Sequence, residues 1–348
     1  MHSMETVQPL IEQWVEQDLL PGASLRVLHQ GRVRFACDIG YTDFRKTHPV
    51  GPRTVYDLAS LTKVTATLPA LLLLAQDGEL RLDDPMARYF PDCPNDKRAI
   101  TVRHLLTHTS GLPADLAERR RDARLELPGL IYGQTLLDAP GERVVYSDLG
   151  MIWLGLLVEK LTGETLDAYV HKEVFAPLGM NATRYRPDLA RFPVIAATEY
   201  CQQRGDWLVG LVHDEKACAM GGVAGHAGLF STSDDLCRYA SFWLYGQPAL
   251  LADEWREQAT RCGTQGLNDS RGLGWDLKGS AEAKSCGALF HPSSFGHIGF
   301  TGTSIWLDPK QDAAVIFLTN AVHLGRNNPI RQLRPILHDA IMTRLSGF

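Results

Sequence analysis

The stretch YDLASLTKVTATLPALLLL, residues Tyr56–Leu74, places a serine three residues before a lysine at the start of an apolar run. Residues three apart on a helix face the same side, so the Lys63 amine can reach the Ser60 hydroxyl. A serine nucleophile needs an adjacent base, and a lysine can be that base when burial and neighbouring charge lower its pKa. The helix N-terminus would add the Ser60 N–H as a donor to developing negative charge. A polar start to a buried helix is the alternative reading of this pair.

The length and composition of the chain predict one large domain or two closely packed ones. Its 348 residues are 45% hydrophobic, which is enough to bury a large core. The 35 basic and 40 acidic residues give a net charge of -5, so there is no electrostatic footprint for nucleic acid or an anionic membrane. We therefore expect a small-molecule or short peptide substrate as the partner, with no nucleic acid and no membrane. Oligomeric state is not readable from these features.

Three features bear on the cellular compartment. Residues 1–22 have neither the basic start and continuous apolar centre nor the small-residue cleavage site of a signal peptide. The apolar run Leu68–Ala75 is far shorter than the roughly 20 residues of a membrane helix. Seven scattered cysteines without a C-x-x-C pair suit a reducing compartment. Together these features predict a cytoplasmic protein.

Helical and strand-like patterns follow one another in an order that suggests two lobes. Helical spacing over Met4–Leu20 precedes a strand hairpin, ASLRVLHQ and RVRFACDIG, with a glycine in its turn. Residues 59–178 are mainly helical, and strand-like runs return from about Phe192. The clearest run, HIGFTGTSIWLDPKQDAAVIFLTNAV, reads as an antiparallel hairpin around Asp308-Pro309. Helical spacing then returns in RQLRPILHDAIMTRL.

Strands at both ends of the chain and helices in its middle predict an α/β (α+β) fold in a single domain, residues 1–348. Residues of about 1–58 and 192–348 would form an antiparallel sheet lobe, and residues of about 59–191 a mainly helical second lobe. A cleft between two such lobes is where a site is expected.

Two further short elements accompany the serine and lysine. An S-x-x-K element occurs in some enzymes with a second S-D-N element and a third K-T-G element. Downstream, PGERVVYSDLG supplies the triplet Tyr146–Asp148, and FGHIGFTGTS supplies the triplet His297–Gly299 at the start of a strand. The order and the structural contexts of these elements both match the three-part pattern.

With these elements in place, the sequence resembles the serine hydrolases of the class C β-lactamase and penicillin-binding-protein superfamily along nearly its whole length. The segments that carry the resemblance, in the family order, are LASLTK, LLTHTSGLP, PGERVVYSDLG, FAPLGM, AGHAGLFSTSDDL, GLGW and GHIGFTGTS. The resemblance implies a β-lactamase-like and penicillin-binding-protein-like antiparallel sheet flanked by helices, with a helical lobe. It also implies a two-step acyl-enzyme mechanism without metal or organic cofactor.

The resemblance implies a role for each matching residue. Ser60 would be the acylated nucleophile and Lys63 its proton acceptor or charge partner. Tyr146 would shuttle the proton between the nucleophile and the leaving group. The backbone N–H of Phe300 would be the second oxyanion donor. An alternative alignment starts an S-D-N element at Ser147, but the surrounding segment fits the tyrosine better.

The sequence departs from the family pattern at two of these elements. Asp148 stands where β-lactamases usually have Asn, so an acid replaces an amide that would contact both Lys63 and a substrate amide. His297 and Gly299 match the first and third positions of K-T-G, and Ile298 replaces the threonine. A histidine is mostly neutral at pH 7, so a permanent cation is lost. The isoleucine also lacks the hydroxyl donor of the threonine. These changes count against a substrate with a free C-terminal carboxylate. A histidine that only bonds to a neighbour is the structural alternative for His297.

Two histidine-containing segments raise the question of a metal. His104 and His108 are four apart, as helical zinc ligands can be, but the H-E-x-x-H pattern is missing and a Ser-Gly-Leu-Pro break follows. In LVHDEKACAMGGVAGHAGLFSTSDDL, His213–Glu215 and His226 lie near small residues, and the segment resembles a subgroup of these hydrolases linked with cell-wall peptide metabolism. A structural loop is the favoured interpretation, with a substrate amine bound by its acids as the alternative. We expect no metal in either segment.

The leading hypothesis is a serine hydrolase (an esterase, amidase or peptidase) that cleaves an ester or amide through an acyl-Ser60 intermediate. Small esters or D-amino-acid-containing peptides of the cell-wall type are the favoured substrates. A true class C-type β-lactamase or a D-Ala carboxypeptidase is one alternative. A catalytically idle, penicillin-binding-like sensor of cell-wall fragments is another, although such a module has no need of Ser60, Lys63 and Tyr146 together.

Overall fold

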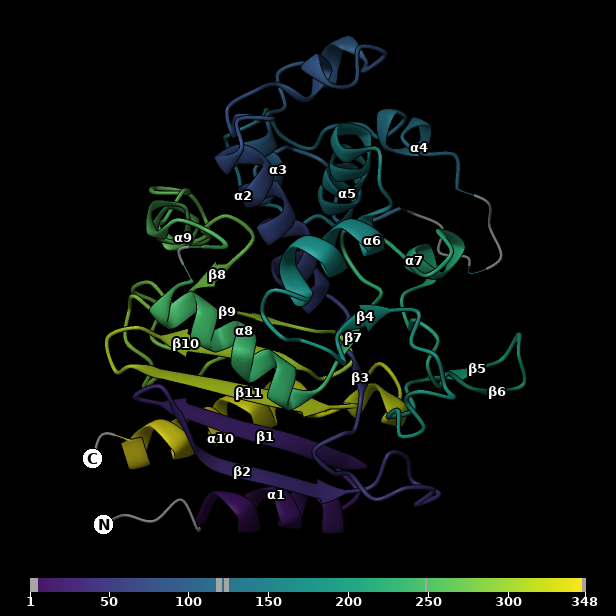
Figure 1. Ribbon diagram of the computed structural model, residues 1–348, viewed down its shortest axis with the longest axis vertical. Coiled ribbons are helices and arrows are strands. Elements are labelled where there is room, and N and C mark those ends of the chain that lie inside the picture. Colours follow the sequence, from purple (N-terminus) through teal and green to yellow (C-terminus); the bar gives the residue numbers. More distant parts are fainter. Residues whose placement is uncertain (1–5, 117–120, 122–124, 248, 346–348) are drawn as a thin grey trace.

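The computed structural model describes residues 6–116, 121, 125–247 and 249–345 of the chain. Figure 1 shows how its helices and strands are arranged. The strands are β1 Gly22–His29, β2 Arg32–Gly40, β3 Tyr56–Asp57, β4 Arg184–Tyr185, β5 Tyr200–Cys201, β6 Asp206–Trp207, β7 Leu229–Ser231, β8 Asp276–Leu277, β9 Phe295–Ile298, β10 Ser304–Asp308 and β11 Ala313–Thr319. The α-helices are α1 Val7–Glu16, α2 Leu68–Gln76, α3 Val102–Leu106, α4 Gly129–Tyr132, α5 Asp148–Thr162, α6 Leu166–Val170, α7 Glu215–Ala219, α8 Ser233–Tyr245, α9 Asp253–Thr260 and α10 Ile330–Leu345. Short 3-10 or π-helical turns cover Lys63–Thr67, Met86–Arg88, Asn95–Lys97, His171–Phe175 and Ala321–Leu324.

Six antiparallel strands form the main sheet, in the order β2-β1-β11-β10-β9-β8. The N-terminal hairpin pairs with the C-terminal strand β11, so that Ala23 lies opposite Thr319 and His29 opposite Ala313. The two ends of the chain therefore build one antiparallel sheet, as the order of sequence patterns predicted.

Helices cover both faces of this sheet. Val315 and Phe317 of β11 belong to a buried cluster with residues of α1 and α10, whereas Ile316 and Leu318 belong to a second cluster that includes residues of α8. Figure 1 shows α8 on one side of the sheet and α1 with α10 on the other. Because successive side chains of a strand point to opposite faces, a strand covered on both faces is apolar throughout.

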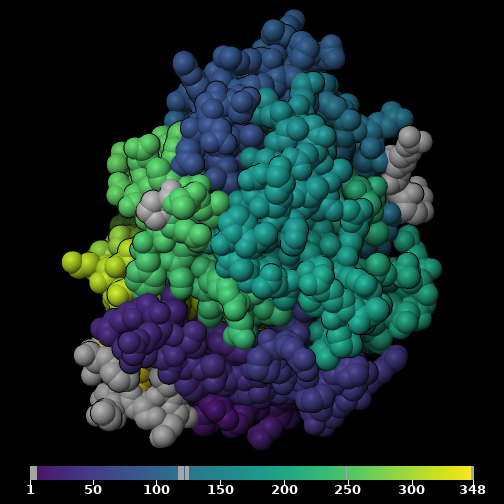
Figure 2. All heavy atoms as spheres, viewed as in Figure 1, coloured from purple at the N-terminus to yellow at the C-terminus, as the bar shows by residue number. Residues whose placement is uncertain are grey.

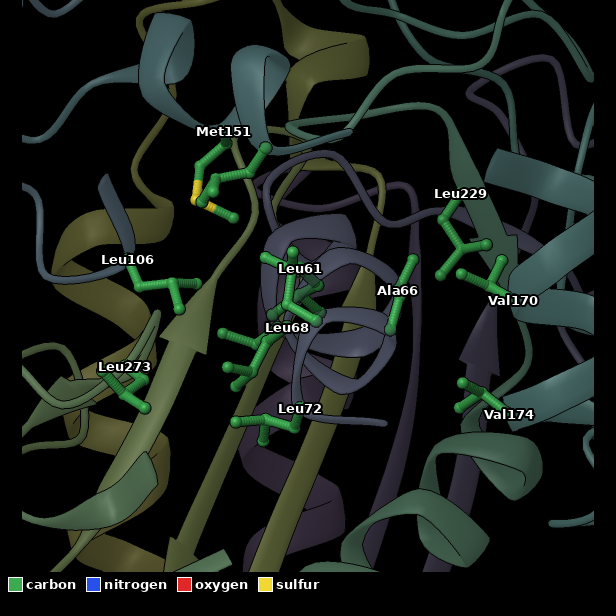
Figure 3. Packing of buried hydrophobic residues seen from close by; sticks show 14 of the residues in the cluster. Leu61, Ala66, Leu68, Leu72, Leu106, Met151, Val170, Val174, Leu229 and Leu273 are labelled. Atoms are coloured by element: carbon green, nitrogen blue, oxygen red, sulfur yellow. The ribbon is translucent and has the colours of Figure 1, made fainter. Parts of the chain in front are cut away.

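The helical lobe packs around α2, which is buried from Leu68 to Ala75. Figure 3 shows residues of this helix and of the turn before it close to apolar side chains from other elements, among them Leu106, Met151, Val170, Val174, Leu229 and Leu273. In Figure 2 the blue segment forms one end of the molecule and the purple segment lies at the other. Among the described residues, no helix is both long enough and apolar enough to cross a membrane.

The helix after Ser60 differs from the continuous helix that its sequence predicts. It opens with a wide π-helical turn, Lys63–Thr67, before the regular part begins. Pro69 has no N–H to donate to the carbonyl of Thr65, and its ring crowds that carbonyl. A wider turn relieves this contact. The distortion lies directly behind the candidate nucleophile.

The strand-like segment HIGFTGTSIWLD contains a turn that its β-rich composition did not predict. Ser304–Asp308 and Ala313–Thr319 form the predicted hairpin as β10 and β11. The chain before them turns sharply between β9 and β10, where the N–H of Gly299 donates to the carbonyl of Thr303 at 2.7 Å. Gly302 in this turn has φ 122°, a conformation that favours glycine. The expected single strand is therefore two strands joined by a turn beside the site.

His338 on α10 is fully buried, and this predicts a pH dependence of stability. Burial, assisted by the charge of Arg334, lowers the pKa of His338 to about 3. Below about pH 6.5 the unfolded chain takes up a proton here while the folded protein does not, so stability falls as pH falls from 7 toward 3. Between pH 7 and 5, we expect His338→Gln to lose about 2 kcal/mol less unfolding free energy than wild type, measured with urea. Equal losses in the two proteins would contradict a neutral buried His338.

Candidate active site

Ser60 follows a loop that buried polar contacts hold in place. The carboxylate of Asp57 accepts the N–H of Ala59 at 2.8 Å and that of His213 at 2.6 Å. The hydroxyl of Thr301, in the β9–β10 turn, donates to the carbonyl of Asp57 at 2.7 Å. Ala59 itself has φ +46°, which is unusual for a residue other than glycine. The backbone immediately before Ser60 is therefore fixed by contacts from distant parts of the chain.

Lys63 is completely buried, and its ammonium group has close polar neighbours from several elements. Nζ lies 2.8 Å from Ser60 Oγ, 3.0 Å from the carbonyl oxygen of His226 and 2.8 Å from Asp148 Oδ1. Burial alone would lower the pKa of Lys63, but the charge of Asp148 and the contact with Tyr146 outweigh it and raise this pKa. The lowered lysine pKa that a base would require is therefore not found. Lys63 is a cation, which favours the charge-partner role over the proton-acceptor role.

Asp148 begins α5 beside this lysine. Burial would raise its pKa, but the charges of Lys63, His226 and Lys216 lower the pKa of Asp148 to about 2. It is therefore a carboxylate at neutral pH. The preceding Ser147 is buried, and its hydroxyl caps α5. This role as a helix cap gives the Ser147 side chain a structural purpose, so the geometry favours Tyr146 over the alternative alignment.

Tyr146 lies among charged and aromatic groups. Its ring centre is 5.0 Å from Lys63 Nζ and 5.7 Å from the guanidinium carbon of Arg271. The rings of His108 and His297 are centred 4.6 Å and 5.9 Å away. The tyrosine side chain also contacts the Lys63 ammonium. A hydroxyl in this place can exchange a proton with groups bound near Ser60.

His297 on β9 is buried and neutral. Burial, followed by the charges of Lys63 and Arg271, lowers the pKa of His297 to about 3. Its Nδ1 lies 2.9 Å from the carbonyl oxygen of Ile298, as the structural alternative for this residue supposes. Its Nε2 has no hydrogen-bond partner within the described part of the chain. The position that holds a lysine in K-T-G therefore supplies no cation here.

Gly299 lets the end of β9 approach the loop before the nucleophile. A Cβ at this position would lie 2.1 Å from Thr303 Oγ1 and 2.5 Å from the carbonyl oxygen of Leu58. Only a residue without a side chain fits such a contact. The half-exposed Phe300 follows at once, so its backbone N–H is held beside the same loop.

A cavity of about 320 Å³ brings the predicted positions together, and those that line it are Ser60, Tyr146, His297, Ile298, Gly299 and Phe300. Lys63 and Asp148 lie behind it and reach it through Ser60.

Sequence reasoning missed the arginines of this cavity. Arg271 and Arg326 line it, but both have carboxylate partners. Arg271 Nη2 lies 2.7 Å from Asp269, and Arg326 Nη2 lies 2.9 Å from Glu199 and also contacts Glu215. Their charges are thus largely compensated within the protein.

Arg331 and Arg334, on α10, also line the cavity but have different surroundings. Within the described ranges, neither forms an ion pair with a carboxylate. Arg334 is buried; its Nη2 donates to the carbonyl of Gly302 at 2.9 Å, while its Nε has no hydrogen-bond partner among the residues described. Burial, with the charge of Arg331, lowers the pKa of Arg334 to about 10, so Arg334 remains a cation at neutral pH. The RQLR spacing on a predicted helix was the signal that could have drawn attention to them.

The segment that contains His213–Glu215 and His226 lies behind the active-site lysine. Lys216, which the sequence reasoning also missed, is buried and lies 2.8 Å from Asp115, 3.3 Å from Asp214 and 3.4 Å from Asp148. These ion pairs lock the segment to the start of α5.

The acids of this segment have partners within the protein. Asp214 contacts Lys216 and Glu215 contacts Arg326, so the geometry does not favour a substrate amine at either acid. Asp148, Asp214 and His226 offer possible metal-ligand atoms within 4.8 Å of one another. The ammonium groups of Lys63 and Lys216 contact the same carboxylates and would repel a further cation, so these residues do not fit a metal ion.

The other histidine pair, His104 and His108, accepts hydrogen bonds from backbone N–H groups. His104 Nδ1 accepts the N–H of Thr101 at 3.3 Å, and His108 Nδ1 accepts the N–H of Ser147 at 3.2 Å. His108 thereby helps to place the start of α5 next to the site.

The sequence model of the Beta-lactamase family matches residues 7–337 of the chain. The chain belongs to the Beta-lactamase family. Two curated relatives from Escherichia coli carry the name "Putative D-alanyl-D-alanine carboxypeptidase". The relative from O157:H7 is 34% identical, with 90% of this chain and 82% of its own length covered, and that from strain K12 is 37% identical, with 78% and 70% covered.

Two solved structures share the fold of this chain. "EstCE1, a hydrolase with promiscuous acyltransferase activity" has a TM-score of 0.77 and 23% identity, and the match covers 95% of this chain and 98% of the other. The octameric penicillin-binding protein homologue from Pyrococcus abyssi also has a TM-score of 0.77, with 22% identity over 98% of this chain and 78% of the other. The predicted β-lactamase-like fold is confirmed, and the protein is a serine hydrolase of the Beta-lactamase family.

Proposed function

We propose that this hydrolase cleaves D-amino-acid-containing peptides that end in a free carboxylate, through an acyl intermediate on Ser60, and accepts small esters as simpler substrates. The observation that carries the proposal is the 2.8 Å hydrogen bond between Lys63 Nζ and Ser60 Oγ, at a cavity that Tyr146 also lines.

Each step of the proposed reaction has a residue within reach. Ser60 Oγ attacks the substrate carbonyl while its proton passes to the oxygen of Tyr146, which enters this step as a phenolate beside the Lys63 ammonium. The Lys63 ammonium stabilises the negative charge that develops on these oxygens. The N–H groups of Ser60 and Phe300 donate to the carbonyl oxygen as it becomes an oxyanion. Tyr146 then protonates the leaving group, and a water molecule hydrolyses the acyl-Ser60 ester along the same proton path.

The sequence alone counted against a substrate with a free carboxylate, because His297 and Ile298 replace the lysine and threonine of K-T-G and remove one cation. Two other observations support such a substrate. Arg331 and Arg334 supply positive charge to the same cavity from another element, without a carboxylate partner among the described residues. Guanidinium groups bind carboxylates through charge-assisted hydrogen bonds. The names of the Escherichia coli relatives point to the same substrate class.

An activity panel tests the proposal. Purified protein is assayed with nitrophenyl esters, D-aminoacyl amides, peptides ending in D-Ala-D-Ala and nitrocefin. The proposal expects the D-peptide to have the highest kcat/KM and nitrocefin a much lower one. Nitrocefin hydrolysis comparable to the best substrate would replace it with the β-lactamase alternative. A lack of turnover on every compound would support the idle sensor.

Arg331→Ala is expected to separate charged from uncharged substrates. Arg331 is exposed, so its loss should leave folding intact. One charge-assisted hydrogen bond contributes about 1.5 to 3 kcal/mol, so kcat/KM for a peptide with a free carboxylate should fall about tenfold or more. A neutral nitrophenyl ester should be hydrolysed at nearly the wild-type rate. The matched control is Arg32→Ala, on the distant edge strand β2, which should change neither. Equal losses on both substrates with Arg331→Ala would contradict carboxylate recognition.

A further inference from the structure

A closed ring of contacts leads from Lys63 through four other residues and back. Lys63 Nζ lies 2.8 Å from Asp148 Oδ1, and Asp148 Oδ2 lies 3.4 Å from Lys216 Nζ. Lys216 Nζ lies 3.3 Å from Asp214 Oδ2, and Asp214 Oδ1 lies 2.7 Å from His226 Nε2. The carbonyl of His226 accepts a hydrogen bond from Lys63 at 3.0 Å. The ring thus joins the helix behind Ser60, the start of α5 and the segment around α7.

Lys216 is the buried cation on the far side of this ring. Its side chain is 3% exposed, and its ammonium group also contacts Asp115 at 2.8 Å. Burial would lower the pKa of Lys216, but the charges of Asp214 and Asp148 and the hydrogen bond with Asp115 raise it. It is not among the residues that line the cavity, so it is placed to act on the site through Asp148.

The charges of this cluster nearly balance. The ammonium groups of Lys63 and Lys216 face the carboxylates of Asp115, Asp148 and Asp214, which leaves one net negative charge among these five groups; His226 is common to every variant and is left out of the count. Substitution of Lys216 by an uncharged residue leaves two, and substitution of Asp148 by Asn leaves none. The double substitution restores the net charge of the native cluster.

We propose that Lys216 is a positioning residue for acyl transfer, which orients the Asp148 carboxylate toward Lys63 and offsets part of its charge. Asp148 and Lys216 together then replace the neutral amide that β-lactamases usually carry at the position of Asp148. An amide combines an oxygen acceptor with N–H donors at no net charge, and a carboxylate beside an ammonium offers the same combination. The inference rests on the proposed roles of Ser60 and Lys63.

The pH dependence of the reaction reports this coupling. The titratable or charged groups that face Lys63 and Tyr146 from the elements around them are Asp148, Lys216, Asp214, His226, His108, His297 and Arg271. Burial and nearby cations hold the pKa of His297 at about 3 and that of His108 well below its ordinary value, so these two stay neutral above pH 5. Neither of these two histidines therefore produces the acidic limb of kcat, and a shift of that limb reports Lys63 and Tyr146 together with the ring of contacts around them.

The two single variants should move this limb in opposite directions. Lys216→Met adds net negative charge to the ring, so the proton on the Lys63–Tyr146 pair is harder to remove. The acidic limb should move up by about one pH unit, and kcat at pH 7 should fall about tenfold. Asp148→Asn should move the limb down. The double variant should return it toward wild type, and Lys216→Arg, which keeps the charge, should stay near wild type.

The experiment measures kcat for a nitrophenyl ester and the rate at which this ester acylates Ser60, both from pH 5 to 9, with thermal unfolding of each variant. The matched control is Lys97→Met, because Lys97 is also a buried lysine, with Asp96 at 2.6 Å. It is expected to lower stability without moving the acidic limb. A purely structural role for Lys216 would produce the same pattern as this control.

The outcomes separate the alternatives. A wild-type limb in folded Lys216→Met, or a double variant no nearer to wild type than Lys216→Met, would overturn the proposal. If Lys216→Met does not fold, the comparison of Asp148→Asn with the double variant serves instead: a limb restored in the double variant supports the proposal, and an unrestored one overturns it. A wild-type protein that is acylated at a residue other than Ser60 would instead overturn the proposed function itself.

Discussion

Ser60→Ala is expected to abolish the covalent adduct with a fluorophosphonate and to lower kcat/KM for the best substrate by about 10⁴-fold or more. Lys63, Tyr146 and the oxyanion donors would remain, but a methyl group cannot form the acyl intermediate. Intact-mass spectrometry measures the adduct, and ester hydrolysis measures the rate. Since Ser60 Oγ accepts a hydrogen bond from the Lys63 ammonium, its loss should change stability much less than it changes the rate.

Ser147→Ala is the matched control for this result. Ser147 is the serine at which the alternative alignment would start an S-D-N element, and its buried hydroxyl caps α5. Loss of the cap should lower stability by about 1 kcal/mol, while the adduct with Ser60 persists. Hydrolysis that survives in Ser60→Ala but not in Ser147→Ala would move the nucleophile to the second serine.

Gly299→Ala is expected to have the second largest effect, with a loss of about 10² to 10³ in kcat. The added Cβ would lie 2.1 Å from Thr303 Oγ1 and 2.5 Å from the carbonyl oxygen of Leu58. The Thr303 side chain can rotate away, but Leu58 contributes backbone just before the nucleophile. The end of β9 must then move, and the N–H of Phe300 moves with it, away from the position of an oxyanion donor. The same overpacking should lower stability by about 1 to 3 kcal/mol.

Gly51→Ala controls for the general cost of replacing a glycine. A Cβ at Gly51 would meet no atom within 4 Å, so both rate and stability should stay near wild type. The measurements are kcat and KM on a nitrophenyl ester, with thermal unfolding of each protein. If folded Gly299→Ala retained the wild-type kcat, Phe300 would not be the oxyanion donor.

Local patterns predicted much of the fold. The alternation in residues 22–40 and the β-rich runs around Asp308-Pro309 predicted the two hairpins, and the apolar run after Ser60 predicted the buried helix. These features depend on residues a few positions apart, which the sequence displays directly. The turn at Gly299–Thr303 was missed because Phe300 and the threonines on either side of Gly302 are also common in strands. The π-helical turn was missed because it depends on the contact of one proline ring with one carbonyl.

The candidate site was predictable where a motif carries it. The three short elements located Ser60, Lys63 and Tyr146, and the structure brings them together. The charge of the cavity was not predictable in the same way. Neutral His297 suggested a substrate without a carboxylate, because no short motif showed that Arg331 and Arg334 approach the same space from α10.

The sequence by itself determined which residues form the helices and strands around the site and the order of the three elements that contain Ser60, Tyr146 and His297. Only the tertiary structure decided the protonation of Lys63. A lysine beside a serine reads as a base when its pKa is lowered, but Asp148 at 2.8 Å raises that pKa, and Lys216 reaches Asp148 from a distant segment. Electrostatic interaction depends on distance in space and on burial, and neither quantity follows from the spacing of residues along the chain.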